Sequence, residues 1–83
     1  MSLEGPAAPP DATQLEVARE QAGLPIGDLW LRYFGLGGTA TPNQLSAALD
    51  GDALLDRHQY NVVAVALNER FMELELDHPV VYE

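Results

Sequence analysis

Apolar side chains recur every three or four residues along residues 55–76, which is the period of one face of an α-helix. The recurring positions are Tyr60, Val63, Ala64, Leu67, Phe71 and Leu74. Asp56 followed by Gln59 fits a capping box, and Leu55 can pack on Tyr60 as a hydrophobic staple. The pattern predicts a helix of roughly 19 residues, about 28 Å long, on which the rest of the chain packs.

The centre of this segment, residues 62–67, is an unbroken apolar run rich in valine, which also favours a buried strand. The capping signals before the run and the clear apolar stripe after it favour a helix instead. Because the run has no polar face, we expect neighbouring elements to cover this helix on more than one side.

Two shorter helices precede it in the first half of the chain. The first is expected to start at Asp11 or Thr13 and to stop at Gly23, where glycine can adopt a positive φ. Its apolar positions are Leu15, Val17, Ala18 and Ala22. The second is expected to have Pro25 in its first turn and to end at the glycines that begin with Gly35.

The clearest local signal is at residues 41–44, where Thr41 can cap a helix, Pro42 suits its first position and Gln44 completes a capping box. The apolar side of this third helix is formed by Leu45, Ala48 and Leu49, and Gly51 is expected to end it.

The two ends of the chain do not fit this helical pattern. Residues 1–10 hold three prolines and no periodicity, so we expect a disordered N-terminal tail. Pro79 biases His78 towards an extended conformation, which predicts an extended C-terminal tail whose Val80 and Tyr82 pack across the helices. The sequence therefore predicts one all-α domain over residues 11–83, a small bundle of about four helices with a long C-terminal helix.

Charge and cysteine content narrow the class of protein. The chain has 13 acidic residues against four basic ones, all arginine, and a net charge of −9. Such a charge repels nucleic acid and anionic membranes, and suits either a basic partner or simple solubility. The chain has no cysteine, no apolar run long enough to span a bilayer and no signal-peptide pattern, so we expect a cytoplasmic protein.

The sequence offers little material for catalysis. His58 and His78 lie at opposite ends of the long helix, about 30 Å apart by the helical rise. There is no phosphate-binding loop with lysine, no nucleophile motif and no HExxH metal pair. Asp50, Asp52 and Asp56 suggest a calcium loop, but their spacing is not that of an EF-hand. We therefore expect no enzyme activity, no cofactor, no metal site and no catalytic residues.

A helix-turn-helix is an alternative interpretation of the two short helices around residues 35–42 (GLGGTATP), because a glycine-containing turn joins them. Asn43, Gln44 and Ser46 could then contact bases. The second helix has no lysine or arginine for phosphate contacts, so DNA binding is disfavoured for this chain alone.

Trp30, Tyr33 and Phe34 are the strongest candidates for a partner-binding surface, because they share a helix face and such aromatic residues anchor interfaces. Core packing explains the same spacing. Apolar residues make up 47% of this short chain, and a protein partner or self-association, for example as a homodimer, would cover the surplus.

Three segments carry a resemblance to known proteins: residues 27–38 (GDLWLRYFGLGG), residues 41–45 (TPNQL), and residues 66–74 (ALNERFMEL) followed by DHPV at 77–80. They are similar to a group of small acidic actinobacterial proteins without an assigned function. The resemblance covers residues 22–82, supplies no activity and implies no catalytic residues. The group has proline where this chain has Val81.

The function predicted from sequence is a non-enzymatic protein-interaction or regulatory module. A helix-turn-helix regulator is the main alternative, and a purely structural dimer is a third reading.

Overall fold

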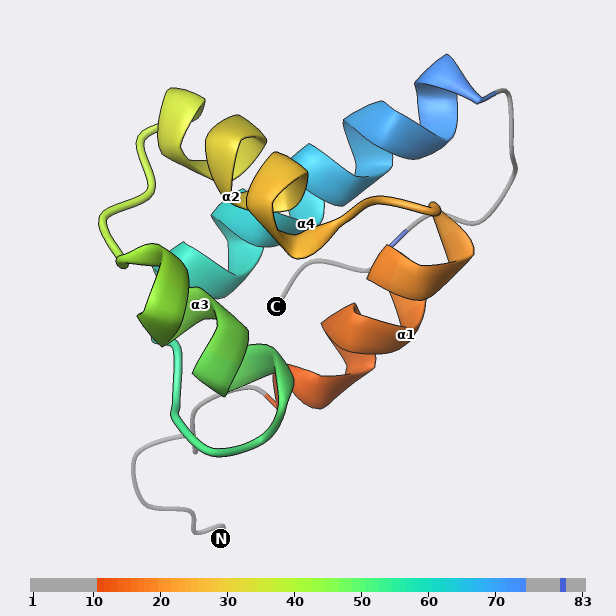
Figure 1. Cartoon of the computed structure of the whole chain (residues 1–83). Coiled ribbons are helices and arrows are strands. Elements are labelled where there is room, and N and C mark those ends of the chain that lie inside the picture. Colours follow the sequence, from red (N-terminus) through yellow and green to blue (C-terminus); the bar gives the residue numbers. More distant parts are fainter. Residues whose placement is uncertain (1–10, 75–79, 81–83) are drawn as a thin grey trace, which may run out of the picture.

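The computed structural model describes residues 11–74 and 80, and these residues form an all-helical fold. The helices are α1 (Thr13–Gln21), α2 (Ile26–Gly35), α3 (Pro42–Leu49) and α4 (Arg57–Glu73) (Figure 1). The prediction of an all-α fold with about four helices is confirmed for this part of the chain. The predicted N-terminal tail and all of the predicted C-terminal tail except Val80 lie outside the described residues.

Helix α4 is the predicted long helix, and it has 17 residues. It begins after Asp56, whose side chain accepts a hydrogen bond from the backbone N of Gln59 at 2.8 Å. Leu55, just before the cap, is therefore outside the helix, although Leu55 and Tyr60 are both buried in one cluster as a hydrophobic staple requires. The predicted start of the helix after Asp56 is confirmed, because the cap residue itself has extended backbone and Arg57 is the first helical residue.

The middle of α4 is buried on several sides. Val62, Val63, Ala64, Ala66 and Leu67 are all buried, as the unbroken apolar run predicted. Both α1 and α2 pack against α4, and α3 packs against α1 and α2 (Figure 1). Helix α4 is therefore the element on which the shorter helices are assembled.

Helix α1 buries a narrower apolar side than the sequence predicted. Leu15, Ala18 and Ala22 are buried, whereas Val17 is 55% exposed, so the prediction that Val17 belongs to the apolar side is wrong. A residue two positions after Leu15 points to the opposite side of a helix, because each residue advances by about 100°. Only residues that lie three or four positions apart share the side of this helix that faces the core.

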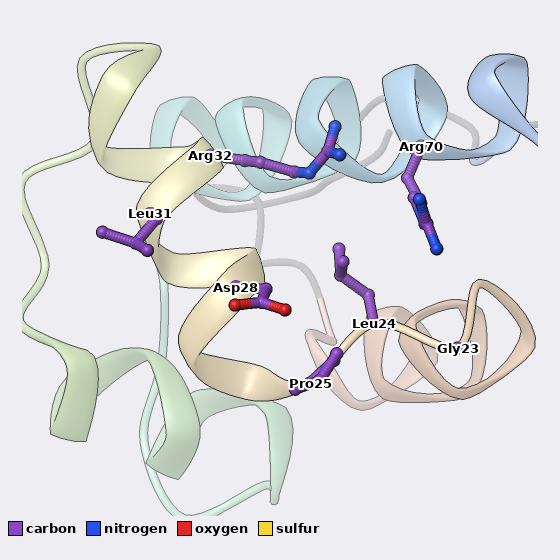
Figure 2. A pocket seen from close by; sticks show the side chains of 7 residues that line it. All are labelled: Gly23, Leu24, Pro25, Asp28, Leu31, Arg32 and Arg70. Atoms are coloured by element: carbon purple, nitrogen blue, oxygen red, sulfur yellow. The ribbon is translucent and has the colours of Figure 1, made fainter.

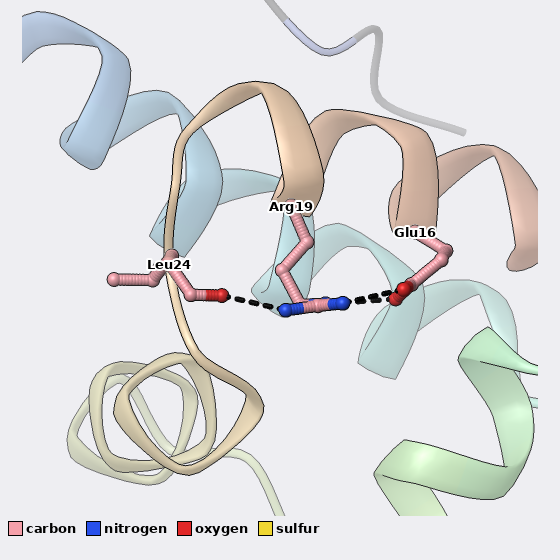
Figure 3. Close-up of polar contacts among 3 residues, drawn as sticks. All are labelled: Glu16, Arg19 and Leu24. Atoms are coloured by element: carbon pink, nitrogen blue, oxygen red, sulfur yellow. Dashed lines mark hydrogen bonds and ion pairs between the residues drawn. The ribbon is translucent and has the colours of Figure 1, made fainter.

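The turn between α1 and α2 is held by Arg19 (Figure 3). Its guanidinium donates to both carboxylate oxygens of Glu16, at 2.8 Å for the Nε bond, and to the backbone oxygen of Leu24 at 2.8 Å. This bridge ties the end of α1 to the chain that leads into α2, where Gly23 adopts a φ of +64°.

The Glu16–Arg19 pair predicts an acid-dependent loss of stability. The hydrogen bond from Arg19 lowers the pKa of the Glu16 carboxyl below its ordinary 4.5. A lowered folded-state pKa stabilises the protein above the ordinary value, and this contribution is lost as the pH falls through the lowered pKa. We expect Glu16→Gln to be less stable than the natural chain at pH 7, by at most about 1 kcal/mol, and the difference to decrease towards pH 3 as Glu16 takes up its proton.

Urea denaturation at the two pH values measures this difference. Glu20→Gln is the matched control, because Glu20 is exposed on the same helix. A Glu16→Gln deficit that stayed constant down to pH 3 would show that the carboxylate charge is not its cause.

The third helix and Val80 complete the packing. Thr41 Oγ1 accepts from the backbone N of Gln44 at 3.1 Å, and Gln44 Oε1 accepts from the backbone N of Thr41 at 2.9 Å. The predicted capping box is confirmed. Val80 packs against the core, and its backbone N and O form hydrogen bonds of 2.6 and 3.0 Å with the Asn68 side chain. Tyr82, predicted to pack with it, lies outside the described residues.

Candidate interaction surface

Helix α2 has apolar side chains on two opposite sides. Leu29 and Tyr33 are fully buried, whereas Leu31 is 61% and Phe34 is 58% exposed. Trp30 lies between the two sides and is partly buried, and its ring stacks on that of Phe34 with 5.0 Å between centroids. The helix is therefore fixed to the core by one side and presents large apolar groups on the other.

The predicted aromatic trio is divided by this arrangement. Trp30 and Phe34 remain accessible, but Tyr33 is buried and cannot contact a partner. Tyr33 and Phe34 are adjacent in sequence, so they point about 100° apart around the helix. The inclusion of Tyr33 among the surface residues is corrected on this ground.

Tyr33 anchors the loop between α2 and α3. Its hydroxyl accepts a hydrogen bond from the backbone N of Ala40 at 2.8 Å and donates to Gln59 Oε1. The same Gln59 oxygen accepts from the backbone N of Thr39 at 3.0 Å. Gln59 therefore connects α4 to this loop and does not complete the capping box that its spacing from Asp56 predicted. The backbone half of that box, from Asp56 to Gln59 N, is present.

Trp30 fixes the loop from its other side. Its Nε1 donates to the backbone oxygen of Ala40 at 2.9 Å. The backbone N and O of Ala40 are therefore both bound by aromatic side chains of α2, the N by Tyr33 and the O by Trp30. This hydrogen bond sets the indole orientation, which leaves the ring free to stack on Phe34. The accessible aromatic pair is therefore a rigid feature of the surface.

The exposed side of α2 carries an apolar strip, which we call the α2 outer face. It consists of the exposed Gly27, Leu31, Phe34 and Gly35 and the partly buried Trp30. A Cβ atom at Gly27 or Gly35 would meet nothing within 4 Å, so no other described part of the chain covers the strip at those points. Leu31 is not among the predicted surface residues, although its spacing of three residues from Phe34 indicates that the two share a side.

One edge of the α2 outer face borders a cleft of about 440 Å³ with both apolar and charged lining residues, namely Gly23, Leu24, Pro25, Asp28, Leu31, Arg32 and Arg70 (Figure 2). Leu31 and Arg32 diverge by about 100° around α2, and Asp28 lies between them (Figure 2). Because Leu31 belongs to both, the apolar strip and the cleft form one continuous surface.

Two arginines of the cleft share one carboxylate. Arg32 donates two hydrogen bonds to Glu73, at 2.8 and 2.7 Å, and an Arg70 nitrogen lies 3.5 Å from the same side chain. The hydrogen bonds from Arg32 lower the pKa of Glu73 below its ordinary value. The buried Nε of Arg70 has no hydrogen-bond partner among the described residues. Because two guanidinium groups share the single carboxylate of Glu73, the cleft can accept a further carboxylate through their remaining N–H groups.

A second pocket of about 290 Å³ lies beside the starts of α3 and α4. Its lining residues are Thr39, Ala40, Gln44, Ala53, Leu54, Leu55, Asp56 and Gln59. The side chains of Gln44, Asp56 and Gln59 already form helix caps and loop contacts. Its polar groups thus have structural roles.

The features considered for DNA or metal binding are dispersed. Gln44 is part of the capping box, and three of the four arginines form ion pairs among the described residues, with Glu16 or Glu73. Asp56 caps α4, His58 is exposed in its first turn, and His78 lies outside the described residues.

Among residues 11–74 and 80, no three His, Cys, Asp or Glu side chains are grouped to hold a metal ion. None of the described helices is long and apolar enough to cross a membrane.

Comparison of the chain with protein-family models, with curated proteins and with solved structures finds no match.

Proposed function

We propose that this chain is a non-enzymatic, cytoplasmic protein-interaction or regulatory module that binds a protein surface through the α2 outer face. The observation that carries the proposal is the exposure of Leu31 and Phe34 on the side of α2 turned away from the core. Large apolar groups gathered on one strip, next to a partly exposed tryptophan, are typical of interaction sites.

The rigidity of the strip supports the same function. The inner side of α2 is held by the buried Leu29 and Tyr33, and Trp30 is oriented by its hydrogen bond to Ala40. A preorganised surface loses little side-chain entropy on binding, which favours affinity. The charged cleft along its edge adds groups that can select a partner.

The non-enzymatic part of the proposal rests on the roles of the titratable side chains. Near the two pockets, Arg32, Arg70 and Glu73 form one ion-pair group, and Asp56 caps a helix. These groups serve the fold or recognition, whereas catalysis needs a convergent set around a reacting atom.

Affinity capture from the lysate of the source cells tests the proposal. Leu31→Asp is expected to lose the captured protein, because it places a charge in the centre of the strip. Leu54→Asp is the matched control, since Leu54 is also an exposed leucine, at 75%, and lies outside the α2 outer face. Circular dichroism checks that both variants are folded.

If Leu31→Asp captures the same proteins as the natural chain and as Leu54→Asp, the α2 outer face is not the binding surface. The fluorescence of Trp30, the sole tryptophan of the chain, gives a second readout, because an occupied strip changes the environment of its indole ring.

A further inference from the structure

Helix α2 carries charges that complement a second copy of itself. Asp28 and Arg32 are its only charged residues, so α2 has no net charge in a chain whose net charge is −9. They lie one turn apart along the edge of the α2 outer face that borders the cleft (Figure 2). In a two-fold symmetric pair of antiparallel helices, the same edge of each helix meets the other in reverse order. Asp28 of one copy then lies opposite Arg32 of the other, and the two-fold symmetry produces this contact twice in each dimer.

The apolar residues match in the same register. When Asp28 and Arg32 meet across the two-fold axis, Leu31 of each copy packs near the axis against Trp30 and Leu31 of the other. Phe34 of one copy lies over Gly27 of the other. The space above Gly27 is open, since a Cβ atom there would have no neighbour within 4 Å, so it can accept a phenyl ring.

The cleft supplies a place for the carboxylate of the second copy. Arg32 and Arg70 line it together with Leu31, and these two arginines share the single carboxylate of Glu73. Asp28 of a second copy would bring a carboxylate to these guanidinium groups from the solvent side. The charged residues and the apolar residues of this surface are thus both complementary to those of a second copy in one register.

We infer that the α2 outer face is a self-pairing surface, on which two copies of this chain form a two-fold symmetric dimer with their α2 helices antiparallel. The inference deepens the proposed function and rests on it, because it names the occupant of the proposed binding surface. A second copy fits better than an unrelated basic protein, since the charges of Asp28, Arg32, Arg70 and Glu73 beside the strip sum to zero.

The test measures the mass of the whole chain by sedimentation equilibrium over about a hundredfold range of concentration, in about 0.15 M salt to screen the repulsion between two acidic chains. The natural chain is expected to shift from monomer to dimer. Asp28→Arg and Arg32→Asp should each weaken the dimer by about tenfold or more, because each places like charges opposite one another.

An equimolar mixture of the two charge variants provides the decisive control. In a mixed pair, the introduced arginine faces the introduced aspartate, and the unchanged Arg32 faces the unchanged Asp28. The mixture is therefore expected to recover dimers that neither variant forms alone. Restored pairing on mixing cannot result from a fold damaged by loss of the Arg32–Glu73 ion pair.

The Leu31→Asp variant tests the apolar part of the dimer interface independently of the charges, and Leu54→Asp is its control. The first is expected to be monomeric and the second to dimerise as the natural chain does. A dimer that survives Leu31→Asp and both charge variants would use another surface, and the inference would be wrong.

A natural chain that stays monomeric at every concentration would also overturn the inference. If Leu31→Asp then still lost a captured protein of another kind, the proposed function would stand without self-pairing. If Leu31→Asp still captured the same proteins as the natural chain, both the inference and the proposed function would be wrong.

Discussion

Replacing Leu67 with alanine is expected to lower the free energy of unfolding by about 2–5 kcal/mol. Leu67 is fully buried in the middle of α4, the helix against which α1 and α2 both pack. The substitution removes apolar surface from the core and leaves a cavity that the neighbouring helices can fill only in part. Because small domains have a total stability of about 5–15 kcal/mol, this loss is a large share of the whole.

Urea denaturation followed by circular dichroism measures the effect. Leu54→Ala is the matched control, because the same atoms are removed from a side chain that is 75% exposed, and it should change stability by less than about 0.5 kcal/mol. A loss well under 1 kcal/mol for Leu67→Ala would mean that α4 is not the central element of the fold.

The start points of α3 and α4 could be predicted from sequence because their signals are local. Thr41 and Asp56 cap helices through backbone groups three residues away, so the whole interaction lies within one turn of chain. Tertiary packing cannot easily override such a contact. The same holds for Gly51, whose φ of +87° ends α3 where glycine predicted it.

The two sides of α2 could not be separated in this way. Apart from Asp28 and Arg32, α2 is apolar or glycine all around, so periodicity alone does not decide which side faces the core. The choice is made by distant partners: Gln59 binds the Tyr33 hydroxyl, and Glu73 binds Arg32 across 41 residues of sequence. The sequence pattern therefore leaves open whether Tyr33 faces the core or a partner, and it does not single out Leu31.

Gln59 shows how a tertiary contact can replace a predicted local one. Its spacing from Asp56 fits a capping box, but its side-chain oxygen accepts from Thr39 N and from the Tyr33 hydroxyl. The Tyr33 hydroxyl belongs to a buried side chain, and leaving its hydrogen without an acceptor costs more than leaving one backbone group at an exposed helix start to water. The loop between α2 and α3 thus determines the role of a residue on α4.

Replacing Gly38 with alanine is expected to be the most damaging change in that loop, with a loss of about 1–3 kcal/mol. A Cβ atom at Gly38 would overlap the ring of the buried Tyr33. The ring cannot move away without breaking the hydrogen bonds of its hydroxyl with Ala40 and Gln59, so the methyl group must displace either the loop or α2. The cost arises from lost space, since Gly38 is not among the glycines with a positive φ.

Thermal and urea denaturation of Gly38→Ala measure this loss, and Gly35→Ala is the matched control. Gly35 ends α2, and a Cβ atom there would meet nothing within 4 Å, so its substitution should be neutral or slightly stabilising. The ring can be tested directly as the cause by adding Tyr33→Leu, which removes the overlapping atoms. If the overlap is the cause, Gly38→Ala costs less in the Tyr33→Leu background than alone, because the two sites are coupled. If Gly38→Ala cost the same in both backgrounds, its effect would arise elsewhere in the loop and not from the Tyr33 ring. The fixed orientation of the Trp30–Phe34 pair would then need another explanation.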